Sequence, residues 1–157
     1  MVSIKKTQRS AGVLAACLCA IIGTAHAEDR AVTEARTGIQ SAMDTLVAAL
    51  KKGTTAEEAA RLWYTDDLVL SMTGAKYYHG LDSFMSTLRE WVAYPVCDWK
   101  LDASSVRASG NLASAFVIET CAPNKAGEPP MVMRSLYVFR KTPEGWRATA
   151  EALTRAP

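Results

Sequence analysis

Metal-binding residue types are scarce in this chain of 157 residues. It has two histidines, of which His26 lies in an N-terminal leader and only His79 in the remainder. Its four cysteines, at positions 17, 19, 97 and 121, include no pair separated by two residues. Zinc sites are typically built from closely spaced cysteines and histidines. The sequence therefore predicts no metal site, and we expect no cofactor.

An excess of one charge is also missing once the leader is set aside. The chain has 18 basic and 16 acidic residues, and three of the basic ones, Lys5, Lys6 and Arg9, belong to the leader. The remaining net charge is close to zero, and no basic stripe is visible in the sequence. Because proteins that bind nucleic acid or anionic membrane surfaces usually carry such a stripe, we expect neither partner.

The apolar run near the N-terminus is too short to span a membrane. It covers residues 11–24, whereas a spanning helix needs about 20 apolar residues. Basic residues precede the run and the small-x-small sequence Ala25-His26-Ala27 follows it, which is the pattern of a secretory signal peptide. We predict that residues 1–27 form a signal peptide and that the mature protein is exported, periplasmic or secreted, without stable membrane insertion.

A second interpretation of the leader stays open. Residues 14–17, Leu-Ala-Ala-Cys, look like a lipoprotein cleavage box, which would leave Cys17 as an acylated N-terminus and anchor. The apolar stretch before that cysteine covers only residues 11–16. A signal peptide usually has an apolar region of about 7 residues or more. We therefore place cleavage after Ala27 first and the lipoprotein second.

Residues 28–157 are long enough for one compact domain, and they contain no internal repeat and no linker. Apolar residues recur every three to four positions in residues 28–53, as on one face of a helix. A second helix is expected over residues 56–64, capped by Thr54 or Thr55. A third should begin just after Gly80 and continue to about residue 92.

The most informative stretch is residues 62–91, LWYTDDLVLSMTGAKYYHGLDSFMSTLREW. A helix end runs into the polar pair Asp66-Asp67, then two short apolar runs flank a turn at Thr73-Gly74, and Gly80 precedes another helix. This order, with DD before the first strand and HG before the next helix, resembles the nuclear-transport-factor-2-like superfamily. It is similar to the SnoaL-like and ketosteroid-isomerase-like branches.

The resemblance covers roughly residues 31–155. It implies a single SnoaL-like α+β domain with a cone-shaped, barrel-like fold. Three helices from the first half of the chain would pack on a curved, mainly antiparallel sheet, and a homodimer would form through the sheet's outer face. In the ketosteroid isomerases a carboxylate on the first hairpin strand is the base, and the matching position falls at or next to Met72. No carboxylate stands there, so the chain departs from the family pattern at the position of the base.

Longer strands should follow over residues 99–109, 112–121, 131–141 and 146–153. A two-residue turn at Gly110-Asn111 sets Ser109 opposite Leu112. Counting outward along an unbroken hairpin places one set of residues on the buried face, and we expect this set to include Trp99, Leu101, Ala103, Phe116 and Ile118. The other face would carry Lys100, Asp102, Val117, Glu119 and Cys121.

The last hairpin gives a similar prediction. Pairing Lys141 with Trp146 puts the aromatic Tyr137 and Phe139 on one face with three alanines, Ala148, Ala150 and Ala152. Arg134 and Glu151 then share the opposite face. They could bind an anionic ligand, although a cross-strand ion pair is the commoner role for such residues. All three strand acids, Asp102, Glu119 and Glu151, are thus predicted to lie away from the pocket.

Only Cys97 and Cys121 remain after removal of the leader, and in an oxidising compartment two cysteines favour a disulfide. The predicted register opposes the bridge, because alternation puts Cys97 on the Trp99 side and Cys121 on the other. A direct bridge would need a bulge or a non-strand conformation at Cys97. We keep both possibilities open.

Three residues are candidates for catalysis: Asp66, His79 and Tyr137. Asp66, with its neighbour Asp67, could act as a general acid or base, but aspartates at a helix end more often hydrogen-bond backbone amides. His79 could be a base at a pocket mouth, but a lone histidine before a glycine more often bonds a backbone carbonyl. Tyr137 could orient a bound molecule through its hydroxyl group.

Aromatic residues come from every element that should converge on the interior of the cone. As ligand-binding candidates we name Trp63, Tyr78, Trp91, Trp99, Phe116 and Tyr137. They could equally fill the core. The leading hypothesis is a pocket that binds a small hydrophobic or aromatic molecule without acid/base chemistry. The alternatives are a SnoaL-like isomerase, cyclase or dehydratase, and a module for self-association.

Overall fold

The computed structural model describes residues 11–72, 77–90, 97–122 and 127–155. It contains three α-helices, one 3-10 turn and seven strands in the described ranges. The helices are α1 (Ala11–Lys51), α2 (Ala56–Trp63) and α3 (Leu81–Glu90). The other elements are β1 (Tyr64–Met72), β2 (Tyr77–His79), β3 (Cys97–Leu101), η1 (Ala103–Ser105), β4 (Arg107–Ser109), β5 (Leu112–Cys121), β6 (Met131–Thr142) and β7 (Gly145–Arg155).

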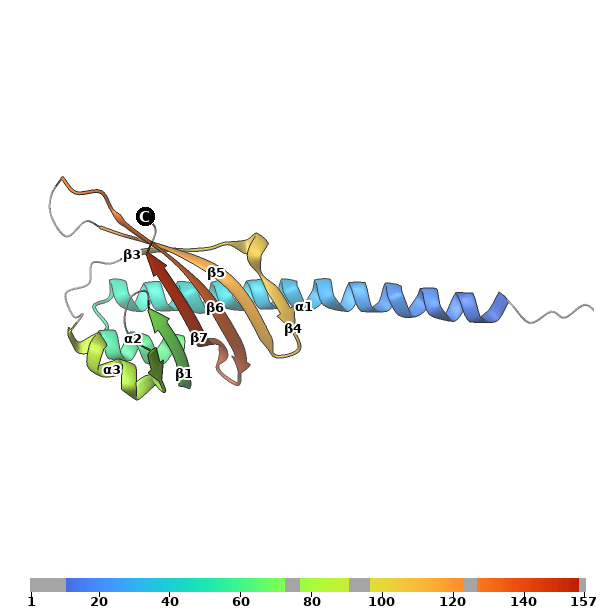
Figure 1. Ribbon diagram of the computed structural model, residues 1–157, viewed down its shortest axis with the longest axis horizontal. Coiled ribbons are helices and arrows are strands. Elements are labelled where there is room, and N and C mark those ends of the chain that lie inside the picture. Colours follow the sequence, from blue (N-terminus) through green and yellow to red (C-terminus); the bar gives the residue numbers. More distant parts are fainter. Residues whose placement is uncertain (1–10, 73–76, 91–96, 123–126, 156–157) are drawn as a thin grey trace, which may run out of the picture.

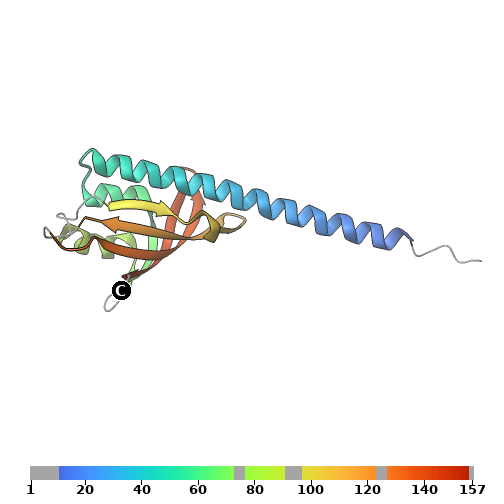
Figure 2. The same cartoon turned by 90° about the horizontal axis from the view of Figure 1, so that it is seen from above.

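The strands form one curved sheet in the order β2-β1-β7-β6-β5-β3, and β4 also pairs with β5. Every neighbouring pair is antiparallel except β1 and β7, which run parallel. The three helices lie against the sheet, and the N-terminal half of α1 projects beyond it (Figures 1 and 2). The predicted α+β architecture, with helices packed on a curved and mainly antiparallel sheet, is confirmed.

Helix α1 is longer than the sequence predicts, because it begins at Ala11 and passes through the predicted cleavage site after Ala27. It ends at Lys51, where Gly53 adopts a φ of 81° that favours glycine. Within the described ranges no helix combines the length and apolar character needed to cross a membrane. Export and cleavage remain predictions.

Helix α2 begins where the sequence predicts. The Thr55 hydroxyl accepts a hydrogen bond from the Glu58 amide, and the Glu58 carboxylate accepts one from the Thr55 amide, which makes a capping box. The helix ends at Trp63, one residue earlier than predicted, and Tyr64 is the first residue of β1. This abrupt change from helix to strand turns Trp63 and Tyr64 into the interior, where both are buried.

The predicted strand over residues 99–109 is interrupted by η1. The Asp102 carboxylate caps this turn by accepting hydrogen bonds from the amide and hydroxyl of Ser104, at 3.0 and 2.6 Å. Ser109 still pairs with Leu112, as predicted. In an unbroken hairpin with this pairing, Trp99 would lie opposite residue 122. It pairs instead with Glu119, so the register before the turn is shifted by three residues.

A shift by an odd number of residues exchanges the two faces of a strand. The predicted faces of this hairpin are therefore wrong on one side of the turn. Trp99 shares the inner face with Glu119 and Val117, whereas Phe116 is 40% exposed on the outer face. Asp102 stays outside the cavity, as predicted, because it caps η1.

A second irregularity lies in the last hairpin. Phe139 pairs with Ala148, but two residues along β6 Tyr137 pairs with Glu151 and not with Ala150. Thr149 is the extra residue of a β-bulge. The bulge turns the Glu151 side chain to the inner face, where it is 4% exposed.

The prediction that Glu151 lies on the outer face with Arg134 is therefore wrong. Arg134 pairs with Thr154 and is exposed. Ala150 and Ala152 likewise do not share the inner face with Tyr137, since they pair with Val138 and Leu136. The predicted ion pair between Arg134 and Glu151 does not form.

The structure joins Cys97 and Cys121 in a disulfide. The two residues lie directly opposite each other in β3 and β5, with their Cα atoms 4.1 Å apart. Neither a bulge nor a non-strand conformation at Cys97 is needed, contrary to the sequence argument, because η1 has already changed the register. The bridge ties the sheet's edge strand to β5.

Candidate functional site

A cavity of about 490 Å³ lies between the helices and the inner face of the sheet. Most of the side chains around it are apolar, from α1, α2, α3 and five of the strands. Its polar side chains are Thr54, Thr55, Tyr64, Glu119, Tyr137 and Glu151. Among the described residues no lysine, arginine or histidine lines it. The interior is thus apolar with an acidic, tyrosine-rich part.

Glu151 is held by two hydroxyl groups. The Tyr64 hydroxyl donates to its Oε2 at 2.5 Å, and the Ser135 hydroxyl donates to its Oε1 at 2.8 Å. Burial raises the pKa of the Glu151 carboxyl above its usual value of 4.5, and the hydrogen bonds from Tyr64 and Ser135 oppose that rise. Because both donors favour the ionised form, they make Glu151 the more carboxylate-like of the two buried acids.

Glu119 has fewer donors around it. The Tyr137 hydroxyl donates to its Oε1 at 3.1 Å, while no described residue bonds to its Oε2. Burial, followed by the negative charge of Glu151, raises the pKa of the Glu119 carboxyl from 4.5 to about 8. At pH 7 it is therefore protonated in about ten molecules for each one ionised.

The two tyrosines remain neutral hydrogen-bond donors. Burial raises the pKa of Tyr64 well above 10, and the charge of Glu151 adds to this. Burial and the charge of Glu119 do the same for Tyr137. The site therefore contains two buried carboxyl groups, of which Glu119 is mostly protonated at pH 7, and two phenols, an arrangement that can take a proton from one atom of a bound molecule and return it to another.

Trp63 stands at the centre of the aromatic side chains. Its ring meets those of Trp99, Tyr137 and Phe139 edge to face, with centroid distances of 5.5, 5.5 and 5.4 Å. Trp63, Trp99 and Tyr137 line the cavity, whereas Phe139 lies behind them in the core. These rings give the cavity a rigid aromatic wall beside Glu119.

Of the residues predicted from sequence to be catalytic, the structure places only Tyr137 in the cavity. Asp66 is exposed on β1, and His79 is exposed at the end of β2 with its ring against Tyr77. The His79 carbonyl accepts a hydrogen bond from the Ser83 hydroxyl at 2.7 Å. Neither residue lies among those lining the cavity.

The predicted ligand-binding residues divide in a similar way. Trp63, Trp99 and Tyr137 line the cavity. Tyr78 is buried beneath α3, where its hydroxyl lies 3.0 Å from that of Thr87, and it is not a lining residue. The predicted inward position of Phe116 is wrong, as described above, and Trp91 lies outside the described residues.

Sequence reasoning missed Glu119 and Glu151 as cavity residues. One signal could have found the first. If Cys97 and Cys121 are taken as bonded, their direct pairing in an antiparallel hairpin places Trp99 opposite Glu119. No comparable signal marks Glu151, because Thr149 is an ordinary strand residue.

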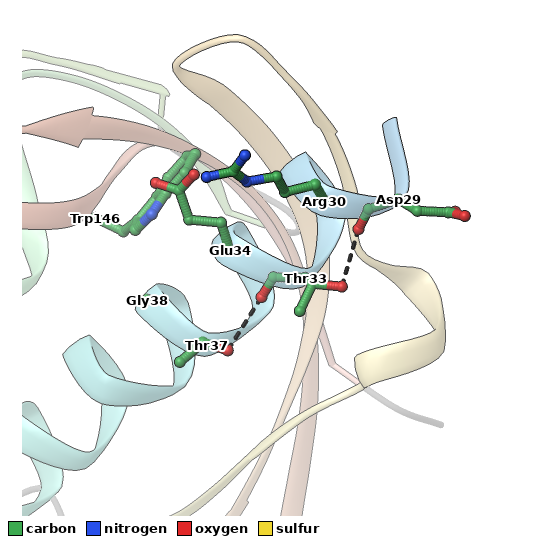
Figure 3. Close-up of a pocket in the computed structure, with 7 residues that line it drawn as sticks. All are labelled: Asp29, Arg30, Thr33, Glu34, Thr37, Gly38 and Trp146. Carbon is green, nitrogen blue, oxygen red and sulfur yellow. Dashed lines mark hydrogen bonds between the residues drawn. The ribbon is translucent and has the colours of Figure 1, made fainter. Parts of the chain in front are cut away.

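A second hollow lies between α1 and Trp146 of β7 (Figure 3). The hydroxyls of Thr33 and Thr37 in its wall donate to backbone carbonyls of their own helix, at 2.9 and 3.0 Å. Glu34 forms an ion pair with Lys141. The side chains of Thr33, Thr37 and Glu34 are thus already engaged within the wall of this hollow. Elsewhere in the described ranges, no three histidine, cysteine or acidic side chains converge as a metal site requires.

Comparison with known proteins agrees with this fold. The family model described as a SnoaL-like domain matches residues 39–152. The chain belongs to the SnoaL-like family. The matched range contains all four ionisable side chains of the cavity, Tyr64, Glu119, Tyr137 and Glu151. No curated protein is significantly similar to this SnoaL-like protein in sequence.

Solved structures share the fold at low sequence identity. An NTF2-like protein of unknown function from Pseudomonas putida KT2440 has a TM-score of 0.63 and 20% identity, over 80% of this chain and 88% of that one. A ketosteroid isomerase-like protein from Erwinia carotovora atroseptica SCRI1043 has a TM-score of 0.60 and 20% identity, over 79% of this chain and 98% of that one. An NTF2-like protein with a cystatin-like fold from Novosphingobium aromaticivorans has a TM-score of 0.57 and 22% identity, over 94% of this chain and 90% of that one. These likenesses show that the SnoaL-like protein shares the fold of these NTF2-like proteins.

Proposed function

We propose that this SnoaL-like protein binds a small, mostly apolar molecule in the cavity and transfers a proton on it, with Glu151 as base and Glu119 as acid. The observation that supports this most strongly is the pair of buried carboxyl groups in an otherwise apolar cavity. Burying two acids is costly, so a fold that retains them without a basic partner in the lining favours a chemical role.

The preference for a receptor without acid/base chemistry depended on a cavity that lacks carboxylates, and that premise is wrong. The two glutamates differ in the way that acid/base catalysis requires. Glu151 accepts hydrogen bonds on both oxygens, while Glu119 keeps one oxygen toward the cavity. Each correctly placed acid or base contributes a rate factor of about 10²–10⁴. An isomerisation, a dehydration or a cyclisation would use one proton removal and one proton delivery.

The name of the Erwinia neighbour, ketosteroid isomerase-like, is consistent with proton transfer by analogy of fold only. The carboxyl groups of this cavity do not lie at the position that the resemblance to ketosteroid isomerases implies for the base, however. Met72, which stands at or next to the position matching the isomerase base, lines this cavity as an apolar residue. The proposed acid and base come instead from β5 and β7.

Export and self-association belong to the same proposal. The disulfide suits an oxidising compartment. The outer face of the sheet carries Phe116 and Leu136, which pair directly across β5 and β6 and are each 40% exposed. Leu112 is also exposed on this sheet. An apolar group of this kind would be covered in a homodimer.

Exchange of carbon-bound hydrogen for deuterium tests proton transfer without knowledge of the final product. Cyclic ketones would be incubated with the protein in D₂O, and loss of the α-proton signals would be followed by NMR. The protein should accelerate exchange of at least one ketone, and Glu119→Gln and Glu151→Gln should each reduce the rate about 100-fold. Glu128→Gln makes the same change at an exposed loop residue and should have no effect. Rates that stay equal in all four proteins would contradict the proposal.

A further inference from the structure

One part of the cavity carries features of a more specific binding site. Trp99 lies directly opposite Glu119 in the pairing of β3 and β5, so their side chains leave the same face of the sheet. Tyr137 donates a hydrogen bond to that same carboxyl group. The ring of Trp63 is nearly perpendicular to those of Trp99 and Tyr137, at 76° and 84°. Three aromatic rings and one carboxyl group thus form a single corner, which we call the Glu119 corner.

The charges around the cavity are of one sign. Its ionisable lining residues are Glu119, Glu151 and two tyrosines, and no basic side chain faces them from the described lining. An anionic ligand would meet two carboxyl groups in a poorly solvated space and no opposite charge. A cation would meet a carboxylate and the negative faces of aromatic rings. The lining therefore favours a positively charged head group.

Glu119 also has a hydrogen-bonding position to spare. Its side chain is buried, with 5% of the residue exposed, and Tyr137 occupies only Oε1. No described residue bonds to Oε2, and Glu119 is a lining residue of the cavity. Oε2 is not one of the fully buried, unpartnered atoms of the described residues, so it is open to the cavity, and a bound molecule or water can hydrogen-bond to it.

We propose that the Glu119 corner binds the ammonium group of a hydrophobic amine, whose apolar part fills the rest of the cavity. This inference rests on the proposed function only in taking the cavity as a ligand site, and it names the ligand class; with an amine bound, Glu119 is the counter-ion and does not act as the acid. The ammonium group donates a hydrogen bond to Oε2 of Glu119 and lies against Trp63 and Trp99. Glu119 loses its proton to solvent as the ion pair forms. The negative charge of the resulting carboxylate then balances the positive charge of the ammonium group.

Three probes with one carbon skeleton and different head groups test the inference: 3-phenylpropylamine, 3-phenylpropanol and 3-phenylpropanoate. Binding to the purified protein at pH 7 would be measured by isothermal titration calorimetry. The amine should bind at least tenfold more tightly than the alcohol, and the carboxylate should not bind measurably. Titrations in two buffers of different ionisation enthalpy should show about one proton released per amine bound, since Glu119 is mostly protonated beforehand. The alcohol should release none.

Two variants and a control locate the effect. Glu119→Gln should bind the amine no better than the alcohol and should release no proton, while Glu128→Gln should behave as the unmodified protein. Trp99→Leu retains the carboxyl group of Glu119 but removes one aromatic ring. It should weaken binding of the amine about three- to tenfold more than binding of the alcohol.

Outcomes with the unmodified protein decide the question even if a variant fails to fold. An alcohol that binds as tightly as the amine, or an amine that binds without proton release, overturns the ammonium site but leaves the cavity as a ligand site. Failure of both amine and alcohol to bind overturns the inference together with the ligand-binding part of the proposed function.

Discussion

Glu119 gives the most direct prediction about stability. Its carboxyl pKa is about 8 in the folded protein and close to 4.5 when the group is exposed to water. Between these values the folded protein binds more protons than the unfolded chain, so the free energy of unfolding must fall as pH rises. The stabilisation is fully present below pH 4.5 and is lost as pH rises through 8.

The size of the effect follows from the shift. Each pKa unit corresponds to about 1.4 kcal/mol. Between pH 5 and pH 8 the Glu119 carboxyl alone should lower the free energy of unfolding by about 3–4 kcal/mol. Glu151 adds a decline of the same sign, because burial raises its pKa as well. Glu119→Gln resembles the protonated side chain and can still accept the hydrogen bond from Tyr137.

Urea unfolding of the unmodified protein and of Glu119→Gln, at several pH values between 5 and 8, measures how the free energy of unfolding depends on pH. The unmodified protein should lose stability across the range, and the variant should lose about 3 kcal/mol less. The free energy of unfolding falls by about 2 kcal/mol per molar urea. The difference between the urea midpoints of the two proteins should therefore change by more than about 1 M from pH 5 to pH 8. Glu128→Gln, an exposed control, should follow the unmodified protein. If the curves for Glu119→Gln and the unmodified protein run parallel, the carboxyl group is not buried as described and the acid role fails with it.

Three further predictions concern the scaffold. Replacing Cys97 and Cys121 by alanine opens a loop with a sequence separation of 24 residues and should lower the free energy of unfolding by about 3–4 kcal/mol in denaturant titrations; an unchanged midpoint would mean that the bridge does not form. Gly38→Ala would place a Cβ 2.1 Å from Cδ1 of Trp146, so thermal unfolding should show a loss of about 1–3 kcal/mol despite the better helix propensity of alanine, and a gain in stability would refute that close approach. Light scattering should show the unmodified protein as the proposed dimer and Phe116→Glu as a folded monomer; a monomeric unmodified protein, or a variant that stays dimeric, would refute a contact through this face.

Much of the scaffold could be predicted because its signals are local. Thr55 with Glu58 three residues later marks the start of α2, and Gly80, with a φ of 78°, marks the break before α3. The alternation along β5 and β6 predicts two long paired strands. These features depend on neighbouring residues only, so a single sequence contains them.

The candidate site could not be predicted in this way, because its acids owe their positions to two irregularities. The turn at η1 changes the pairing of β3 with β5 by three residues, and the extra residue Thr149 changes the end of β7 by one. Each shift is odd, so each moves every side chain beyond it to the opposite face. Simple counting from the turns therefore placed Glu119 and Glu151 on the outside.

The amino-acid sequence by itself determined the order of helices and strands, the caps that begin and end them, and the aromatic composition of the interior. Only the tertiary structure decided which acids that interior contains. Strand pairing sets which face a side chain occupies, and pairing depends on contacts between residues far apart in the chain, such as Trp99 with Glu119 and Tyr137 with Glu151. Burial in those pairs, and not the glutamate side chain as such, gives Glu119 a proton to donate at neutral pH.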